Sequence, residues 1–425
     1  MPDAAYDAAA VPVMFGPDFD RDPSPAYEWL RSNAPAFRLP LPGDTWTWLL
    51  TRHADVVSAM ADPRLSKCPS VAAEHWRKAN LGLPADHRPT LIGHMNNVEG
   101  EEHARLRKAC AGAFGPRRLQ HMRDRTHQLA NELLDPILDR GEGDLVEDFA
   151  YPLGIRSICE LIGIPESLLD EVRPPALVVA AGDVTDMASM LKATDDLDAL
   201  LADVVARKRA EPGADLISDL LAQEAAGKLT DDEVAATAFL SLIAGHETTI
   251  SLIASTALTL ITHPEEAARA RADGSHLTLV IEEVLRRDTP LQNTSWRFVT
   301  EPMELAGQRM EAGDPILLSL LAANRDPEVH PEPLAFRPGE RPVRHVAFGV
   351  GPHICIGAAL ARMQASAALE TLFDRAPSMT LTVPEDRLVW WPSAITRGLH
   401  NLPVSSRRHL RGGPAARSPS GRRGP

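Results

Sequence analysis

The sequence predicts a mostly α-helical fold with small β-sheets. Apolar residues recur at helical spacing along most of the 425 residues, whereas strand-like stretches are few and short. One helical segment, residues 230–264, spans about 50 Å at 1.5 Å per residue, which is the width of a whole domain. No repeat of solenoid length is visible. These features favour one domain over residues 1–405, followed by a basic tail over residues 406–425.

The shorter elements are predicted in chain order from their spacing and their flanking breakers. Helices are expected over residues 22–33, 53–63, 127–140 and 169–184. Strands are expected over residues 45–51 and 295–300. The segment 303–321 has the pattern of a hairpin with glycines at its turns.

The long helical segment opens with a capping box formed by Thr230 and Glu233, and it closes at His263–Pro264. It is apolar on nearly every face, so we expect it to run through the core. A membrane span is the alternative. However, residues 245–249 at its centre are polar, and buried polar groups are costly unless they are satisfied. This polar run indicates a lined cavity, with a satisfied structural kink as the other interpretation.

Composition limits the partners and the compartment. Hydrophobic residues make up 44% of the chain, enough for a sizeable core, and the formal net charge of −14 argues against nucleic acid as the main partner. Four cysteines are scattered without paired spacing, which suits a reducing cytosol. The N-terminal segment has neither a basic start nor an apolar run, so we expect no signal peptide and no membrane anchor. The sequence thus predicts a cytoplasmic protein whose arginine-rich tail is disordered.

The stretch FGVGPHICIG, residues 348–357, places Cys355 at the start of a helix-forming run. A helix N-terminus lowers the pKa of a thiol and favours the thiolate that a metal needs. The three glycines permit positive φ and a close approach of the backbone to a flat ligand. A structural zinc site needs four ligands, so a single thiolate suits an axial heme ligand better. A buried structural thiol, or a nucleophile assisted by His353, is the alternative.

This stretch resembles the heme-binding loop of the cytochrome P-450 family, and most closely that of its soluble bacterial members. The match rests on six residue types at fixed offsets, expected by chance about once per hundred million positions. The matching residues are Phe348, Gly349, Gly351, His353, Cys355 and Gly357. The resemblance implies heme b (iron protoporphyrin IX) between the long central helix and the helix after the cysteine loop. It also implies that Cys355 ligates the iron and that Phe348 packs against the heme.

The central polar run, Ala244-Gly245-His246-Glu247-Thr248, resembles the oxygen-activation motif of the same family. The resemblance implies that Thr248 hydrogen-bonds oxygen on the iron. Glu247, which stands where many members have aspartate, would bring protons from solvent. Ala244 and Gly245 are expected to line the heme, with Gly245 leaving room for dioxygen and substrate.

Two further motifs carry structural and heme-binding expectations. Glu283 and Arg286 match the family's E-x-x-R, whose members face one another on a helix, and the resemblance implies a buried structural pair. Arg341 is the expected third member, with Arg344 as the nearby alternative. The heme propionates are expected to receive charge-assisted hydrogen bonds from four residues. These residues are His103, Arg107, Arg297 and His353. Without the family context, His103 and Arg107 would instead belong to a solvated helix face.

The resemblance implies a heme-thiolate monooxygenase that inserts one oxygen atom from O2 into a medium-to-large organic substrate. Electrons would come from NAD(P)H through a ferredoxin reductase and a ferredoxin, and a basic patch would receive the acidic ferredoxin. The candidate patch residues are Arg105, Lys108, Arg344 and Arg362. The expected reaction is a tailoring step, hydroxylation or epoxidation, in secondary-metabolite or antibiotic biosynthesis by a monomer. Expected substrate contacts are Asn293, Ile395 and Thr396.

Three other functions stay open. The same fold supports oxidative coupling or ring formation, and nothing in the sequence excludes it. Peroxide-driven oxidation is disfavoured by Glu247 and Thr248, because a proton relay is needed mainly when dioxygen is the oxidant. A non-catalytic heme-binding sensor or helper is disfavoured because both Cys355 and Thr248 are intact.

Overall fold

The structure is a computed structural model that describes residues 11–42, 45–79, 92–181, 186–340 and 343–406. The basic tail predicted over residues 406–425 therefore lies, apart from its first residue, outside the described residues. Arg341, the expected third member of the Glu283–Arg286 pair, lies outside them too.

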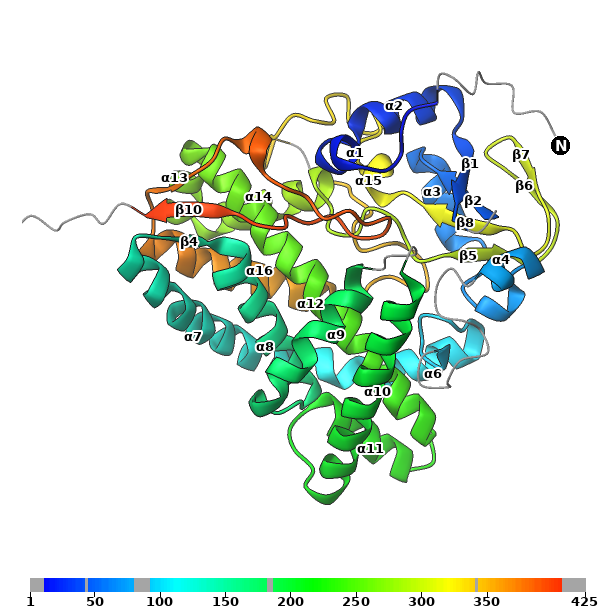
Figure 1. Cartoon of the computed structure of the whole chain (residues 1–425), viewed down its shortest axis with the longest axis horizontal. Helices are drawn as coiled ribbons and strands as arrows, with labels where there is room; N and C mark the ends of the chain where they lie inside the picture. The colour runs from blue at the N-terminus through cyan, green and yellow to red at the C-terminus, as the bar shows by residue number, and fades with distance from the viewer. Residues whose placement is uncertain (1–10, 43–44, 80–91, 182–185, 341–342, 407–425) are drawn as a thin grey trace, which may run out of the picture.

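Helices make up most of the described chain, as the sequence predicts (Figure 1). The N-terminal half contains α1 (Pro17–Arg21), α2 (Ser24–Asn33), α3 (His53–Ala61), α4 (Glu74–Ala79), α6 (Gly100–Cys110), α7 (Pro116–Arg140), α8 (Tyr151–Ile162), α9 (Leu169–Ala181) and α10 (Met187–Ala210). The C-terminal half contains α11 (Leu216–Ala225), α12 (Asp231–Thr262), α13 (Pro264–Ala272), α14 (Gly274–Arg287), α15 (Leu320–Asn324) and α16 (Ala358–Arg375).

The strands are short and form three small sheets among the described residues. The largest sheet has the order β1-β2-β8-β5-β3, the second β4-β10-β9, and the third is the pair β6-β7. Their bounds are β1 (Ala36–Leu41), β2 (Thr45–Leu50), β3 (Leu65–Ser66), β4 (Glu142–Asp144), β5 (Arg297–Val299), β6 (Met303–Leu305), β7 (Gln308–Met310), β8 (Pro315–Leu318), β9 (Met379–Leu381) and β10 (Pro403–Ser406). The mostly α fold with small sheets is thus confirmed.

Helix α12 passes through the helical half of the molecule, with α8, α14 and α16 packed around it (Figure 1). Its predicted capping box is present, since Thr230 Oγ1 accepts from the Glu233 N–H and the Glu233 carboxylate accepts from the Thr230 N–H. Among the described residues, α12 alone has the length and composition of a membrane span, and 61% of its most apolar window is buried inside the protein. It therefore has the environment of a core helix.

Two expectations about element boundaries differ from the structure. Helix α7 begins at Pro116 instead of residue 127, because its first turns are mostly polar and show little apolar periodicity. The segment 303–321 splits into two parts. Strands β6 and β7 form the expected hairpin, whereas β8 pairs in parallel with β2, with Trp48 opposite Ile316. That pairing joins segments far apart in the sequence, so local pattern does not reveal it.

Candidate active site

The Cys355 loop is folded so that the backbone N–H groups of Gly357 and Ala358 donate to the cysteine sulfur. The N–H of Cys355 donates to the Phe348 carbonyl at 2.8 Å, which closes the loop, and α16 begins three residues after the cysteine. Gly349 and Gly351 have φ of 71° and 78°, a conformation that favours glycine. Gly357 has an ordinary φ of −84°, so it is not required for a positive dihedral.

The thiol of Cys355 lies under opposing influences. Cys355 retains accessible surface, yet the surrounding protein desolvates the sulfur and this burial raises the pKa of the thiol. The backbone N–H groups of Gly357 and Ala358, with the cations Arg107 and Arg362, act in the opposite direction. A bound metal ion would displace the proton, and these donors would then stabilise the thiolate.

The centre of α12 presents a polar, accessible strip inside a buried helix. Ala244 is exposed, although Leu242 and His246 on the same turn are fully buried. Thr248 Oγ1 donates to the Ala244 carbonyl at 3.1 Å. The Glu247 carboxylate makes no hydrogen bond to a described residue, and burial raises its pKa to about 7. A carboxyl group with this pKa exchanges its proton readily near neutral pH.

Gly245 lies at the contact between α8 and α12, a packing role that the sequence did not predict. The sequence interpretation assigned it to leaving room for dioxygen and substrate. In the structure, a Cβ at this position would stand 2.8 Å from Cγ1 of Ile158 on α8. The glycine therefore allows α8 and α12 to approach closely. A side chain at this position would point into the interface between the two helices.

The four predicted propionate ligands come from three separate segments, and the structure brings these segments together. The rings of His103 on α6 and His353 in the cysteine loop have centroids 4.2 Å apart. Arg297 on β5 is buried, and its charge acts on His353. Arg107, one turn after His103, is half-buried and acts on both His103 and Cys355.

Two charged residues that the sequence analysis did not assign also belong to this cluster. Glu99 Oε2 accepts from His353 Nε2 at 2.8 Å, and its Oε1 accepts from the Lys67 N–H at 2.8 Å. Burial would raise the pKa of Glu99, but these hydrogen bonds outweigh it and lower the pKa. Lys67 is 6% exposed. Glu99 directly precedes α6 and was detectable as the acid before the His103 helix, whereas nothing in the sequence marks Lys67.

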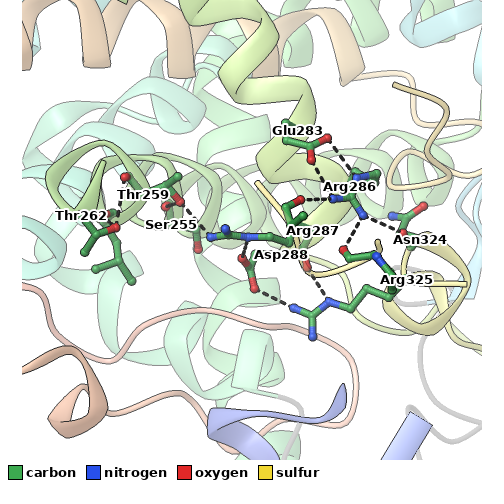
Figure 2. Close-up of polar contacts among 12 residues, drawn as sticks. Ser255, Thr259, Thr262, Glu283, Arg286, Arg287, Asp288, Asn324 and Arg325 are labelled. Atoms are coloured by element: carbon green, nitrogen blue, oxygen red, sulfur yellow. Dashed lines mark hydrogen bonds and ion pairs between the residues drawn. The ribbon is translucent and has the colours of Figure 1, made fainter. Parts of the chain in front are cut away.

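Glu283 and Arg286 form a buried bidentate ion pair on α14 (Figure 2). Arg286 Nη2 lies 2.7 Å from Glu283 Oε1, and the two side chains are 4% and 6% exposed. The guanidinium also donates to the carbonyls of Asn324, Pro333 and Ala335, so α14 is tied to α15 and to the segment after it. All donors of the pair are used, which is what burial of a charge requires.

Glu282, adjacent on α14, ties this helix to the cysteine loop. Its carboxylate accepts from Arg362 Nε at 2.6 Å, from Arg362 Nη2 at 2.9 Å and from His345 Nε2 at 3.0 Å. The Arg362 guanidinium lies 4.4 Å from the ring centroid of Phe348. Burial opposes ionisation, but these donors lower the pKa of Glu282 to about 2.

The expected substrate contacts lie together in one place. Asn293 Nδ2 donates to the Ala394 carbonyl at 2.6 Å, and its N–H donates to the Ile395 carbonyl at 3.3 Å. Thr396 forms an isolated antiparallel β-bridge with Leu291 in the same region. The Asn293 Oδ1 atom is buried and has no partner among the described residues.

Two of the four candidate docking cations are paired with carboxylates, and two are not. Arg105 is paired with Glu233, and Arg362 is paired with Glu282. Lys108 and Arg344 are exposed, and neither side chain has a partner in the described part of the chain. The unpaired positive charge expected for a docking patch is therefore carried by these two residues.

Comparison with known proteins agrees with this geometry. The family model for cytochrome P-450 matches residues 179–376. The chain is 36% identical over 408 residues to the cytochrome P-450 monooxygenase PikC of Streptomyces venezuelae, covering 94% of this chain and 96% of that one. It is 35% identical over 401 residues to 6-deoxyerythronolide B hydroxylase of Saccharopolyspora erythraea, covering 93% and 98%. The solved structure of tirandamycin C-bound P-450 monooxygenase TamI superimposes with a TM-score of 0.83 at 34% identity, covering 92% and 98%.

Fold and site together define a heme-dependent oxidoreductase, and the chain belongs to the cytochrome P-450 family. It is a monooxygenase, an enzyme that incorporates oxygen into its substrate. The residues present fit the heme that the family implies. A sulfur with two backbone N–H donors stands at a helix start, and the middle of a buried helix is accessible. The buried Arg297 Nε has no partner among the described residues. This is expected of a donor whose acceptor is an anion such as a heme carboxylate.

Proposed function

We propose that the chain is a heme-thiolate monooxygenase with Cys355 as the iron ligand. The observation that carries this assignment is Cys355, an exposed residue whose sulfur receives the Gly357 and Ala358 N–H groups at the start of α16. Heme, when bound, supplies the activation of dioxygen and the oxidant. Phe348 would pack beside it. His103, Arg107, Arg297 and His353 would hold its two carboxylates through charge-assisted hydrogen bonds.

Two residues of α12 would transfer protons to the reaction site. Because the pKa of Glu247 is raised to about 7, its carboxyl group is about half protonated near neutral pH and can both release and regain a proton there. Thr248 follows it in sequence and carries a hydroxyl that donates to the carbonyl of the exposed Ala244. We assign Glu247 to proton supply and Thr248 to handing the proton onward.

The expected substrate is a medium-to-large organic molecule, and the reaction a hydroxylation or epoxidation in secondary-metabolite or antibiotic biosynthesis. Support comes from the names of the relatives, which include a 6-deoxyerythronolide B hydroxylase and a monooxygenase bound to tirandamycin C. Substrate contacts are assigned to Asn293, Ile395 and Thr396. Incorporation of one atom from labelled O2 into the product tests this reaction. A product that has lost two hydrogens without gaining oxygen would instead identify oxidative coupling or ring formation.

Electrons are proposed to pass from NAD(P)H through a ferredoxin reductase and a ferredoxin to a cytoplasmic monomer. The exposed, unpaired Lys108 and Arg344 offer positive charge to an acidic ferredoxin. The chain's net charge of −14 disfavours nucleic acid, and the burial of α12 disfavours a membrane span. Turnover with NAD(P)H that requires both proteins supports this route. Equal turnover with peroxide alone would identify a peroxygenase.

The thiolate assignment is tested by the carbon monoxide difference spectrum of the dithionite-reduced protein, for wild type and Cys355→Ala. We expect a red-shifted Soret band in wild type that is absent from the variant, since the thiolate alone donates enough charge to cause it. A band at the histidine-ligated position in both proteins contradicts the assignment and favours a heme-binding sensor. The absence of heme contradicts both.

A further inference from the structure

Lys67 is a buried cation whose hydrogen bonds are incomplete. It follows directly after β3, and the whole residue is 6% exposed. Its Nζ donates to Ser295 Oγ at 2.6 Å, and no other described atom accepts from it. An ammonium group has three N–H donors, and a lysine is almost never fully buried unless it is paired. Lys67 therefore has donors to spare in a place where unpaired donors are costly.

The neighbouring strand places a second incomplete cation beside Lys67. Strand β3 pairs with β5, with Leu65 opposite Val299, so Arg297 at the start of β5 lies close to Lys67. Arg297 Nη1 donates to the Leu65 carbonyl at 3.3 Å, and Arg297 Nε has no partner among the described residues. Two buried cations thus stand together, and each has unused donors.

The charges around Lys67 do not neutralise it. Glu99 is the one described carboxylate that acts on Lys67, and its two oxygens already accept from the Lys67 backbone N–H and from His353. The other titratable groups that interact with Lys67 are Arg297, His94, His103 and His353, all of them cationic or neutral. The cluster carries an excess of positive charge that one carboxylate cannot balance.

We propose that Lys67 is a further ligand of a heme carboxylate and shares that anion with Arg297. This inference rests on the proposed function, because it requires that heme binds beside Cys355. That carboxylate, together with Glu99, would balance the charges of Lys67 and Arg297, and it would accept their unused donors. Burial and Arg297 lower the pKa of Lys67 to about 7 in the protein alone, and a neighbouring anion would restore its full charge.

A purely structural lysine, held only by Ser295, is the competing explanation. In that case, removing either partner of the Lys67–Ser295 hydrogen bond would have the same effect, and neither change would alter the properties of the heme. The proposal makes the opposite prediction. The positive charge of Lys67 matters to the heme, and the hydroxyl of Ser295 does not.

The test compares purified holoenzymes carrying Lys67→Met, Lys67→Arg, Ser295→Ala and the control Lys78→Met. Lys78 is a surface lysine whose partner is Glu74, one turn away on α4. Two quantities are measured for each protein. These are the rate of heme transfer to excess apomyoglobin and the midpoint potential of the iron.

Lys67→Met is expected to release heme about tenfold faster, the factor that corresponds to one lost charge-assisted hydrogen bond. Its midpoint potential should fall, because a lost cation disfavours reduction of the iron. Lys67→Arg, Ser295→Ala and Lys78→Met should stay close to wild type in both measurements.

Heme release and potential that stay unchanged in Lys67→Met overturn the inference. So does a Ser295→Ala protein that loses heme as Lys67→Met does, with the potential unchanged in both. Should Lys67→Met fail to fold, Lys67→Gln takes its place, because it keeps a donor for Ser295 and removes only the charge. A lower midpoint potential and faster heme release in Lys67→Gln support the inference, and wild-type values of both overturn it. A wild-type protein without a thiolate-type carbon monoxide spectrum would instead refute the proposed function itself.

Discussion

Gly245 of α12 and Ile158 of α8 lie so close together that a Cβ on the glycine would stand 2.8 Å from Cγ1 of the isoleucine. Real Cβ atoms do not approach other carbon atoms this closely, so a larger residue here would force the Ile158 side chain or one of the two helices to shift. This contact fixes the helix that carries Glu247 against the helix beside it. The glycine in the polar run is therefore a packing residue of the fold.

Gly245→Ala is expected to lower the free energy of unfolding by about 1–3 kcal/mol, the usual cost of overpacking a core. Adding Ile158→Val removes Cδ1, the Ile158 atom nearest to that Cβ position, and should recover part of that loss. Urea unfolding of the single and double variants measures both effects. Gly112→Ala is the control, because nothing lies within 4 Å of its Cβ position. A double variant no more stable than Gly245→Ala would show that Ile158 is not the source of the strain.

Ionised Glu247 is expected to lower the free energy of unfolding, because its carboxylate is buried. Its pKa is about 7 in the folded protein against an ordinary 4.5, so ionisation at pH 8 favours the unfolded state. Glu247→Gln should therefore raise the free energy of unfolding by up to about 3 kcal/mol at pH 8. The gain should shrink as the pH falls from about 7 and vanish below about 4.5, where the glutamic acid is protonated in both states.

Unfolding of the two proteins measured from pH 5 to pH 8 checks this expectation, with Glu301→Gln as the exposed control. The same Glu247→Gln protein should consume electrons with less product formed, since its amide cannot supply a proton. A stability gain independent of pH would mean that Glu247 is not buried as an acid.

The sequence predicts features that depend on neighbouring residues. The bounds of α12 follow from the Thr230–Glu233 capping box and from Pro264, and the cysteine loop is one contiguous motif. Features that join distant segments are not predicted in this way. Strand β8 pairs with β2, which is far from it in the sequence, and the side chain of Lys67 donates to Ser295, 228 residues later. Single residues in these contacts carry no local pattern, so only the folded chain shows them.

Asp288 is expected to be a major stabilising residue, because it neutralises several buried arginines. It accepts from Arg287 Nε at 3.0 Å and from Arg325 Nη2 at 2.8 Å, and Arg397 Nε lies 3.6 Å away (Figure 2 shows the first two). Burial opposes its ionisation, but these cations hold its pKa well below the usual range. Asp288→Asn would remove the strongest counter-charge of Arg325 and Arg397, at a cost of about 3–5 kcal/mol.

Urea unfolding at pH 7 measures the cost of Asp288→Asn, and Asp386→Asn on an exposed turn is the control. Because the folded-state pKa is depressed, the contribution of Asp288 is complete above its ordinary pKa of 3.8 and diminishes as the pH falls below it. The difference between wild type and Asp288→Asn should accordingly be smaller at pH 3 than at pH 7. An equal difference at both values would show that its charge is not what stabilises the fold.

Glu282 is expected to hold the cysteine loop in place through Arg362. The carboxylate fixes the Arg362 guanidinium, which lies against Phe348, and the Phe348 carbonyl accepts from the Cys355 N–H. Glu282→Gln keeps the shape of the side chain but weakens these charge-assisted bonds by about 1.5–3 kcal/mol. We expect a lower unfolding midpoint at pH 7 and, in the reduced protein with carbon monoxide, a larger fraction without the thiolate-type band.

The pH dependence separates this effect from a general loss of packing. The pKa of Glu282 is lowered to about 2, so its contribution is present above about 4.5 and is lost as the pH falls toward 2. Wild type and Glu282→Gln should therefore converge in stability as the solution is acidified. Glu304→Gln, on the exposed face of β6, should match wild type throughout. If Glu282→Gln unfolds earlier but keeps the thiolate-type band, Glu282 stabilises α14 and α16 without positioning Cys355.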